Sequence, residues 1–140
     1  MHVQSSAGFN NGINTRFFQQ GTLNINAGSQ FVNEGGATFS HTGGTLNVTA
    51  NGTFDMQGGN VTLSGGTTNI STGGRMLAGA NSLCLDGGTL NVSDQGTMTV
   101  SSNLTQNAGG HVVHNNGQFT NNGAYGLNGG NFTVDAGGAA

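Results

Sequence analysis

The sequence predicts an all-β fold, a single parallel β-helix (β-solenoid) of about six coils with three short strands in each coil of about 22 residues. Three observations predict it: a Gly-Thr-x-Asn unit that recurs at a nearly constant interval, short segments in which polar and apolar residues alternate, and glycine-rich pairs between those segments. Such a chain buries its apolar side chains by stacking coils, because one coil alone cannot enclose them.

The Gly-Thr-x-Asn unit occurs four times with clear spacing. Its copies begin at Gly21, Gly44, Gly66 and Gly88, at intervals of 23, 22 and 22 residues. We expect the same phase to continue, in degenerate form, at Gly110-His111-Val112-Val113 and at Gly130-Asn131-Phe132-Thr133. The solenoid repeats therefore cover residues 21–140, and we expect residues 1–20 to form an irregular first coil or N-terminal edge.

Residues 44–65 show the three strands of one coil most clearly. Polar and apolar residues alternate in Thr45-Leu46-Asn47-Val48, in Thr53-Phe54-Asp55-Met56 and in Asn60-Val61-Thr62-Leu63. A period of two residues is typical of a strand. Glycine-containing pairs follow each strand and supply the positive φ angles that tight turns need. Each strand is expected to pair in parallel with the strand one coil later.

The alternation also predicts which side chains face the interior. We expect a core ladder formed by Leu23, Leu46 and Leu90 from strand one and by Phe31, Phe54 and Phe119 from strand two. The same pattern assigns Val112 to strand one, Phe17 to strand two and Leu127 to strand three. Apolar residues of one type then lie one above another in successive coils.

A Phe-x-Asn-x-Gly pattern marks one corner of the coil. It occurs at residues 31–35 and 119–123, and residues 17–21 form a Gln version of it. We interpret the Asn or Gln as an inward amide that hydrogen-bonds the turn backbone or the amide of a neighbouring coil.

One outward face is unusually regular. It carries a column of threonines beside a column of asparagines: Thr22, Thr45, Thr67 and Thr89, and Asn24, Asn47, Asn69 and Asn91. The structural interpretation is an external asparagine ladder in which each amide bonds the next. The functional alternatives are a flat Thr-x-Asn array that orders water on ice and a glycan-binding face, the latter with little aromatic support.

The composition argues against several classes of function. Lys and Arg together number only 2, with a net charge of -3, which leaves no basic patch for nucleic acid. The 5 carboxylates do not obviously converge, and the 4 histidines are expected at scattered surface or corner positions. We therefore expect no enzymatic activity, no cofactor and no metal site. Cys84, the single cysteine, is expected to act as a small filler residue.

The Gly-Thr-Leu-Asn-Val and Phe-x-Asn-x-Gly units resemble the β-helical passengers of bacterial autotransporters and filamentous-haemagglutinin-like adhesins. The resemblance implies a secreted or surface-exposed bacterial or phage protein. We accordingly expect an extracellular or cell-surface location, although Met1-His2-Val3-Gln4 does not begin a signal peptide. No apolar run approaches the roughly 20 residues of a transmembrane helix.

We find no capping segment at either end of the predicted solenoid: the C-terminal unit from Gly130 looks like an ordinary coil cut short, and residues 1–20 are less regular but contain strand-like pieces. Such ends indicate either a piece of a longer solenoid or subunits that stack head to tail. An open coil end presents strand edges and a slice of the core. We therefore expect a structural, self-associating β-solenoid, either a fibre subunit or an adhesin stalk, whose partner is itself in a head-to-tail homo-oligomer or filament. An ice-binding or glycan-binding module that uses the outward Thr/Asn face is the alternative.

Overall fold

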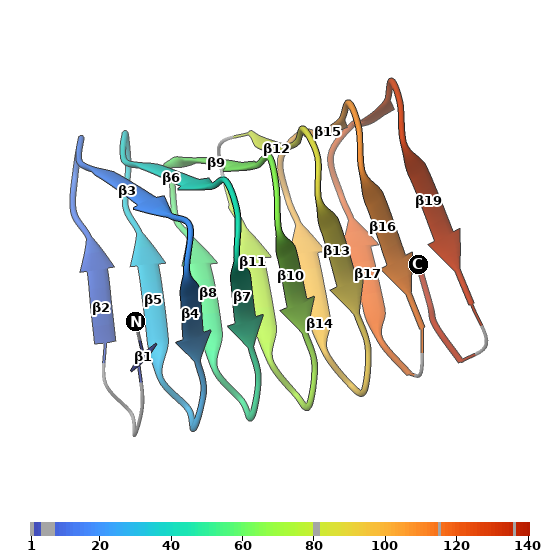
Figure 1. Ribbon diagram of the computed structural model, residues 1–140, viewed down its shortest axis with the longest axis horizontal. Coiled ribbons are helices and arrows are strands. Elements are labelled where there is room, and N and C mark those ends of the chain that lie inside the picture. Colours follow the sequence, from blue (N-terminus) through green and yellow to red (C-terminus); the bar gives the residue numbers. More distant parts are fainter. Residues whose placement is uncertain (1, 4–7, 80–81, 115, 136) are drawn as a thin grey trace.

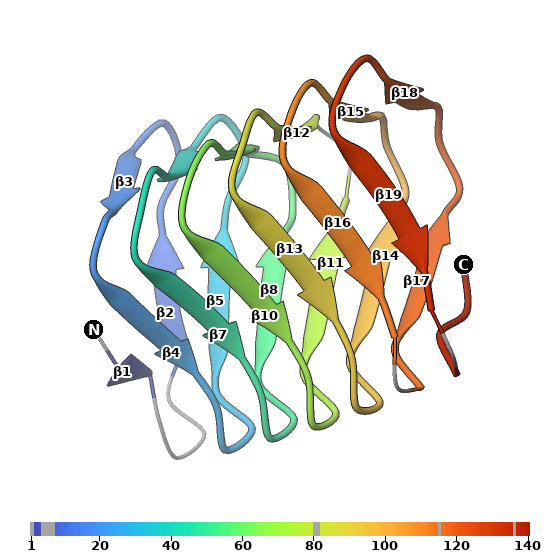
Figure 2. The same ribbon diagram turned by 45° about the vertical axis from the view of Figure 1, so that its right-hand side comes forward.

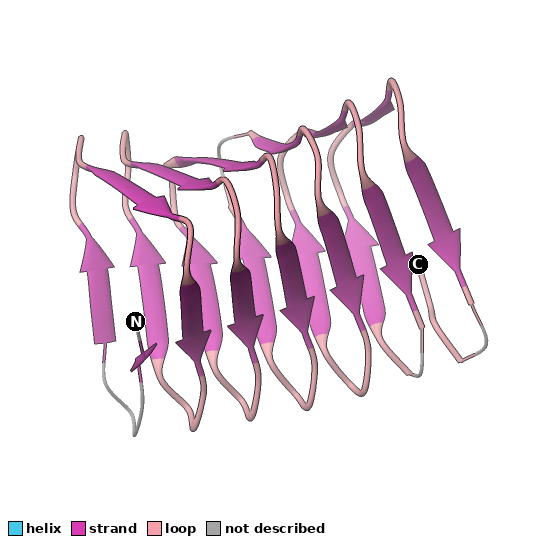
Figure 3. Cartoon of the chain, in the orientation of Figure 1, coloured by secondary structure: helices cyan, strands magenta, loops and turns pink. Residues whose placement is uncertain are grey.

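A computed structural model describes residues 2–3, 8–79, 82–114, 116–135 and 137–140. These residues form nineteen β-strands and no helix (Figure 3). Every strand pairing is parallel, and each strand lies beside the strand one coil later. The predicted fold class, an all-β parallel solenoid with three strands in each coil, is confirmed.

The strands form three sheets. Sheet 1 contains seven strands: β1 (His2–Val3), β4 (Thr22–Ile25), β7 (Thr45–Val48), β10 (Thr67–Ile70), β13 (Thr89–Val92), β16 (Gly110–Val113) and β19 (Asn131–Val134). Sheet 2 contains six: β2 (Gly8–Asn11), β5 (Gln30–Asn33), β8 (Thr53–Met56), β11 (Arg75–Ala78), β14 (Thr97–Val100) and β17 (Gln118–Asn121). Sheet 3 contains six: β3 (Arg16–Gln19), β6 (Thr38–His41), β9 (Asn60–Leu63), β12 (Leu83–Leu85), β15 (Leu104–Gln106) and β18 (Tyr125–Leu127).

The coils stack along the long axis of the molecule, and the two termini lie toward opposite ends of the stack (Figure 1). Sheets 1 and 2 face each other with their strands running in opposite directions, and sheet 3 closes the third side. Tight turns join sheet 1 to sheet 2 along one edge (Figure 2). Residues 1–20 supply one strand to each sheet, namely β1, β2 and β3.

The turn from sheet 1 to sheet 2 explains one column of glycines. In one coil, Ala50 and Asn51 have φ angles of 48° and 62°, and Gly52 N–H donates to the Thr49 carbonyl at 2.8 Å. Two successive positive φ angles are typical of a type I′ turn. A glycine follows the two positive-φ residues, at Gly52 in this coil and at Gly74 in the next. There is little room for a side chain at this position, because a Cβ on Gly74 would lie 1.9 Å from the Val48 carbonyl oxygen.

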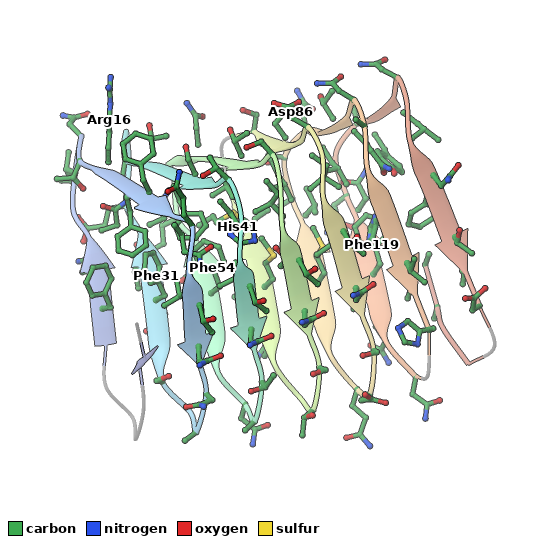
Figure 4. All side chains as sticks on the ribbon, in the orientation of Figure 1. Arg16, Phe31, His41, Phe54, Asp86 and Phe119 are labelled. Carbon is green, nitrogen blue, oxygen red and sulfur yellow. The ribbon has the colours of Figure 1, made fainter. Side chains whose placement is uncertain are left out.

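The core lies between the three sheets and contains all six residues of the predicted ladder. Leu23, Phe31, Leu46 and Phe54 are fully buried, Leu90 is 2% exposed and Phe119 is 6% exposed. Aromatic rings gather toward both ends of the stack, where Phe31 contacts Phe54 at one end and Phe119 contacts His111 at the other. Phe31, Phe54, His41 and Phe119 all point into the space between the sheets (Figure 4).

Phe17 lies in a different sheet from the one predicted. It belongs to β3 in sheet 3, where it pairs with Phe39 and stacks on its ring at 5.6 Å. Phe9 takes the strand-two position and pairs with Phe31. The sequence assignment was wrong because residues 1–20 contain a complete set of three strands, so that Phe17 comes one strand later than expected.

Val112 was also assigned wrongly. Gly110 pairs with Thr89, which places His111 opposite Leu90 inside the core and Val112 opposite Asn91 on the outer face. The positive φ that Gly44, Gly66 and Gly88 share in successive coils continues at Gly109, with a φ of 84°, and not at Gly110. This coil is shorter than its predecessors, and a register shift of one residue sends every side chain of a strand to the opposite face.

Two of the histidines that were expected at surface or corner positions are buried: His111 because of this register shift, and His41 in the corner column of Gln19. His41 is 1% exposed and His111 is fully buried. Leu127 lies on the predicted strand three, opposite Gln106, but its side chain is 51% exposed. β18 is the last strand of sheet 3, so no further coil among the described residues covers it.

The inward amides of the Phe-x-Asn-x-Gly pattern are confirmed. Asn33 is fully buried, accepts a hydrogen bond from Asn11 Nδ2 at 2.6 Å and donates to the Asn60 carbonyl at 3.5 Å. The Gln version does not lie at the same corner as predicted: Asn33 is at the corner between sheets 2 and 3, whereas Gln19 is at the corner between sheets 3 and 1, where its Nε2 donates to the Thr45 carbonyl at 3.3 Å. Each amide thus hydrogen-bonds, across a corner, the backbone of the first residue of a strand in the next coil.

Gln106 forms a similar corner that the pattern did not mark. Its Nε2 donates to the Asn131 carbonyl at 3.0 Å, and its Oε1 accepts from the Tyr125 hydroxyl at 2.6 Å. Asn121 Nδ2 donates to the Gly123 carbonyl at 3.0 Å. The amide nitrogens of Asn33, Gln19, Gln106 and Asn121 thus all donate to backbone carbonyls at the corners, whereas the amide oxygens of Gln19 and Asn121 are buried without a hydrogen-bond partner.

Candidate functional site

The outward face of sheet 1 brings together all eight residues of the predicted Thr/Asn face. Thr22, Thr45, Thr67 and Thr89 are directly opposite one another in register, and so are Asn24, Asn47, Asn69 and Asn91. They come from β4, β7, β10 and β13, the four strands on which the Gly-Thr-x-Asn unit was found. The alternation of the strand places Thr and Asn outward while the residues between them fill the core.

Side-chain hydrogen bonds link the asparagines into a continuous ladder. Asn47 Nδ2 donates to Asn24 Oδ1 at 2.7 Å, Asn69 Nδ2 to Asn47 Oδ1 at 2.9 Å, and Asn91 Nδ2 to Asn69 Oδ1 at 3.0 Å. All three bonds run toward the N-terminal coil. The ladder ends at Asn91, because Val112 occupies the next position in the column. The amides are therefore held in one orientation by their neighbours.

The threonine column lies beside the ladder and is more open. Thr22 and Thr89 are exposed, whereas Thr45 and Thr67 are partly exposed. Their hydroxyl and methyl groups repeat at the interstrand spacing of about 4.8 Å. β4, β7, β10 and β13 contain no charged residue. The face can therefore offer ordered hydrogen-bonding groups at a fixed spacing on strands without a charged side chain.

No family model, curated protein or solved structure matches this chain. Within the described ranges, no helix has the length and hydropathy needed to cross a membrane. The same residues contain no group of three or more His, Cys, Asp or Glu side chains placed to hold a metal ion. The site must therefore be interpreted from its own geometry.

A second polar column, missed in the sequence, lies at the corner after sheet 3. Asn107 Nδ2 donates to Asp86 Oδ1 at 2.7 Å, and Asn128 Nδ2 donates to Asn107 Oδ1 at 2.9 Å. The thiol of Cys84 also donates to Asp86 Oδ1 at 3.0 Å. The signal that could have found this column is the equal spacing of residues 86, 107 and 128, which differ by one short coil.

Cys84 lies on the outer side of β12 and is only partly buried. It therefore does not fill space in the core, as a small buried residue would. Burial, together with the hydrogen bond to Asp86 and its charge, raises the pKa of the Cys84 thiol to about 11. The hydrogen bonds from Cys84 and Asn107 lower the pKa of Asp86. The thiol is therefore protonated near neutral pH, which makes it a poor nucleophile.

The carboxylates lie on different parts of the coil. Asp55 is on the outer face of β8 in sheet 2, where its Oδ2 accepts from Gln57 Nε2 at 3.2 Å. Asp86 follows sheet 3, and Asp94 lies in a turn between sheets 1 and 2. Arg16 and Asp86 both point away from the coil interior (Figure 4). These three carboxylates therefore do not form an acid–base pair.

Replacing Asn69, in the middle of the ladder, should lower the free energy of unfolding by about 1–2 kcal/mol. Asn69→Ala removes one donor and one acceptor, and leaves Asn47 Oδ1 and Asn91 Nδ2 without their ladder partners. Denaturant unfolding at neutral pH measures the change. The matched control is Asn103→Ala, at an exposed asparagine that directly precedes β15, which should change stability by less than about 0.5 kcal/mol. Equal losses in the two variants would show that the ladder contributes nothing of its own.

Proposed function

We propose that this protein is a structural, extracellular β-solenoid that associates with copies of itself head to tail, as a fibre subunit or an adhesin stalk. The observation that supports the proposal is the state of the sheet edges. Among the described residues, β17, β18 and β19 are the last strands of their sheets; β18 and β19 have a neighbouring strand on one side only, and the outer side of β17 is covered only by a single bridge to Ala139. Edge strands present backbone N–H and C=O groups that can pair with another chain.

The C-terminal edge also exposes apolar side chains. Leu127 and Val134 are 51% and 45% exposed, and Tyr125 and Phe132 are only partly buried against the core. At the other end, Phe9 and Phe17 are likewise partly buried. A further coil on either edge would remove this apolar surface from water, which favours association by about 25 cal/mol for each Å² buried.

Little charge opposes this contact. Lys+Arg number 2 and Asp+Glu number 5 in 140 residues, and the sequence contains no lysine. Lysine on an edge strand is a common protection against edge-to-edge pairing. Each backbone hydrogen bond formed across a joint would add roughly 0.5–1.5 kcal/mol. The β-solenoid fold therefore supports a role as a stacking element better than a catalytic role.

A proline at the free edge tests the proposal. The N–H groups of Asn131 and Asp135 donate to carbonyls of the preceding coil, so the alternation of a parallel strand turns the N–H of Val134 toward the open side. Val134→Pro should block the stacking of one copy on the next while the pairing of β16 with β19 survives. Val134→Ala is the matched control. Sedimentation velocity and electron microscopy of the unmodified protein should show elongated oligomers that lengthen with concentration. A protein that stays monomeric at high concentration would refute the proposal.

The regular sheet-1 face favours a second candidate, a surface that orders water against ice. Its threonines are in register on four neighbouring strands and it carries no charge. Thermal hysteresis measures this activity directly, and Thr45→Tyr should abolish it without unfolding the protein. A glycan array tests the related glycan-binding alternative. The exposed Phe18 lies on sheet 3, away from the Thr/Asn face.

A further inference from the structure

We infer that copies of this chain join with β19 of one copy paired to β4 of the next, so that β2 through β19 form the repeating unit and β1 is displaced from the joint. The inference rests on the proposed head-to-tail stacking and specifies its register. It names the strands, and hence the side chains, that would meet. The occupant of the open edge is thus a second copy in a defined alignment.

The number of strands in each sheet supports this alignment. Sheet 1 has seven described strands, whereas sheets 2 and 3 have six each. The strand without a counterpart in the other sheets is β1, so β2 through β19 make up complete sets of three. Copies that pair β17 with β2, β18 with β3 and β19 with β4 continue all three sheets without a gap. If β19 paired with β1 instead, sheets 2 and 3 would each lack a strand at the joint.

The segments that now cover these edges are short. β1 has two residues and is in register only with Asn24 and Ile25 of β4. At the opposite end, a single bridge between Gln118 and Ala139 covers β17. The joint pairs three strands of three or four residues, β17 to β19, with β2 to β4 of the next copy. It would therefore form more backbone hydrogen bonds than the displacement of both β1 and Ala139 breaks.

The aromatic columns match across the joint. Phe119 would lie against Phe9 of the next copy, in the relation that Phe9 has to Phe31, whose rings stack at 4.8 Å. Tyr125 would lie against Phe17 of the next copy, on the side of Phe17 opposite to Phe39. Stacked and edge-to-face aromatic pairs stabilise a contact beyond the effect of the area that they bury.

The polar columns match as well. Asn121 and Asn11 occupy the same inward position of sheet 2, and Asn11 already donates to Asn33 in the coil that follows it. Asn121 would meet Asn11 of the next copy in the same way. Arg16 is the only charged residue on the six strands that form the joint, and it would lie against Ala124, the residue before β18. No charge repulsion therefore opposes this register.

Disulfide trapping distinguishes the two registers. Thr133 and Asn24 occupy the same outward column at opposite ends of the stack, and His2 is the residue opposite Asn24 on β1. In a Cys84→Ser background, we expect the Thr133→Cys/Asn24→Cys pair to form a ladder of disulfide-linked multimers on a non-reducing gel. The Thr133→Cys/His2→Cys pair, the matched control, should remain almost entirely monomeric on that gel. Far-UV circular dichroism checks that both variants keep the fold.

The opposite result on the gel, with cross-linking through His2→Cys and not through Asn24→Cys, would overturn the register while leaving head-to-tail stacking in place. Sedimentation without any oligomers would instead refute the proposed function, and this inference with it. The axial repeat of a filament gives an independent measurement. A joint between β19 and β4 predicts six coils, or roughly 29 Å at about 4.8 Å for each coil, whereas a joint through β1 predicts about 34 Å.

Discussion

Phe54→Asp should leave the protein unfolded at room temperature and neutral pH. Phe54 is fully buried, pairs with Phe31 and Met76 in the neighbouring coils and contacts the ring of Phe39 at 4.8 Å. Deleting a buried phenylalanine side chain costs about 3–5 kcal/mol, and an unpaired carboxylate among apolar neighbours adds several more. The sum approaches the whole stability of an ordinary domain, about 5–15 kcal/mol.

Far-UV circular dichroism and a thermal melt measure this outcome. Thr53→Asp is the matched control, because Thr53 lies on the same strand with its side chain outward, beside Arg75 of the next coil. It should shift the melting temperature by only a few degrees. Leu90 is a poorer position for the test, since His111 lies opposite it and could pair with an introduced carboxylate. A cooperative melt of Phe54→Asp near the unmodified value would show that the inward register of sheet 2 is wrong.

Lowering the pH from 7 to 4 should reduce the free energy of unfolding by about 3 kcal/mol through His111 alone. The ring is fully buried, packs edge to face on Phe119 at 4.8 Å, and has no hydrogen-bond partner at either nitrogen. Burial lowers the pKa of His111 to about 4 from its ordinary value of 6.5. The unfolded chain therefore binds a proton below about pH 6.5 that the folded chain does not bind until about pH 4.

The stabilisation from neutral His111 is thus fully present above pH 6.5 and is lost as the pH falls toward 4. Burial lowers the pKa of His41 as well, against a smaller opposing effect of the nearby Thr67 and Gln19 backbone, so His41 acts in the same direction. Denaturant unfolding at a series of pH values measures the slope. His111→Leu should remove most of this pH dependence of the free energy of unfolding, and leucine should be tolerated there because the position lies opposite Leu90. His114→Leu should keep the loss of stability at low pH that His111 causes. A slope unchanged in His111→Leu would exclude His111 as its source.

The fold class was predictable because its signals are one-dimensional. A period of two residues within strands and a period near 22 between coils define parallel stacked coils without any knowledge of distant contacts. The same two periods predicted the core column from Leu23 to Leu90 and the outward Thr/Asn columns. Inward amides such as Asn33 were also recognisable, because glycine two residues later marks a corner.

Positions where the coil length changes could not be obtained this way. His111 entered the core in place of Val112 because one coil is shorter by a residue, and the pairing of Gly110 with Thr89 is visible only when the coils are stacked. Phe17 was misplaced because nothing local distinguishes a strand of sheet 2 from one of sheet 3. The Asp86–Asn107–Asn128 column joins turn residues whose alignment depends on the same pairing.

The sequence therefore determines that the chain winds into a three-sided solenoid and which face of most strands is apolar. The packed coils decide the register of the short coils, the burial of His41 and His111, and the edges at which β18 and β19 remain open to another strand. The reason is physical: alternation specifies the two faces of a strand, whereas hydrogen bonding to the neighbouring coil selects which residue faces which, and a shift by one exchanges the faces.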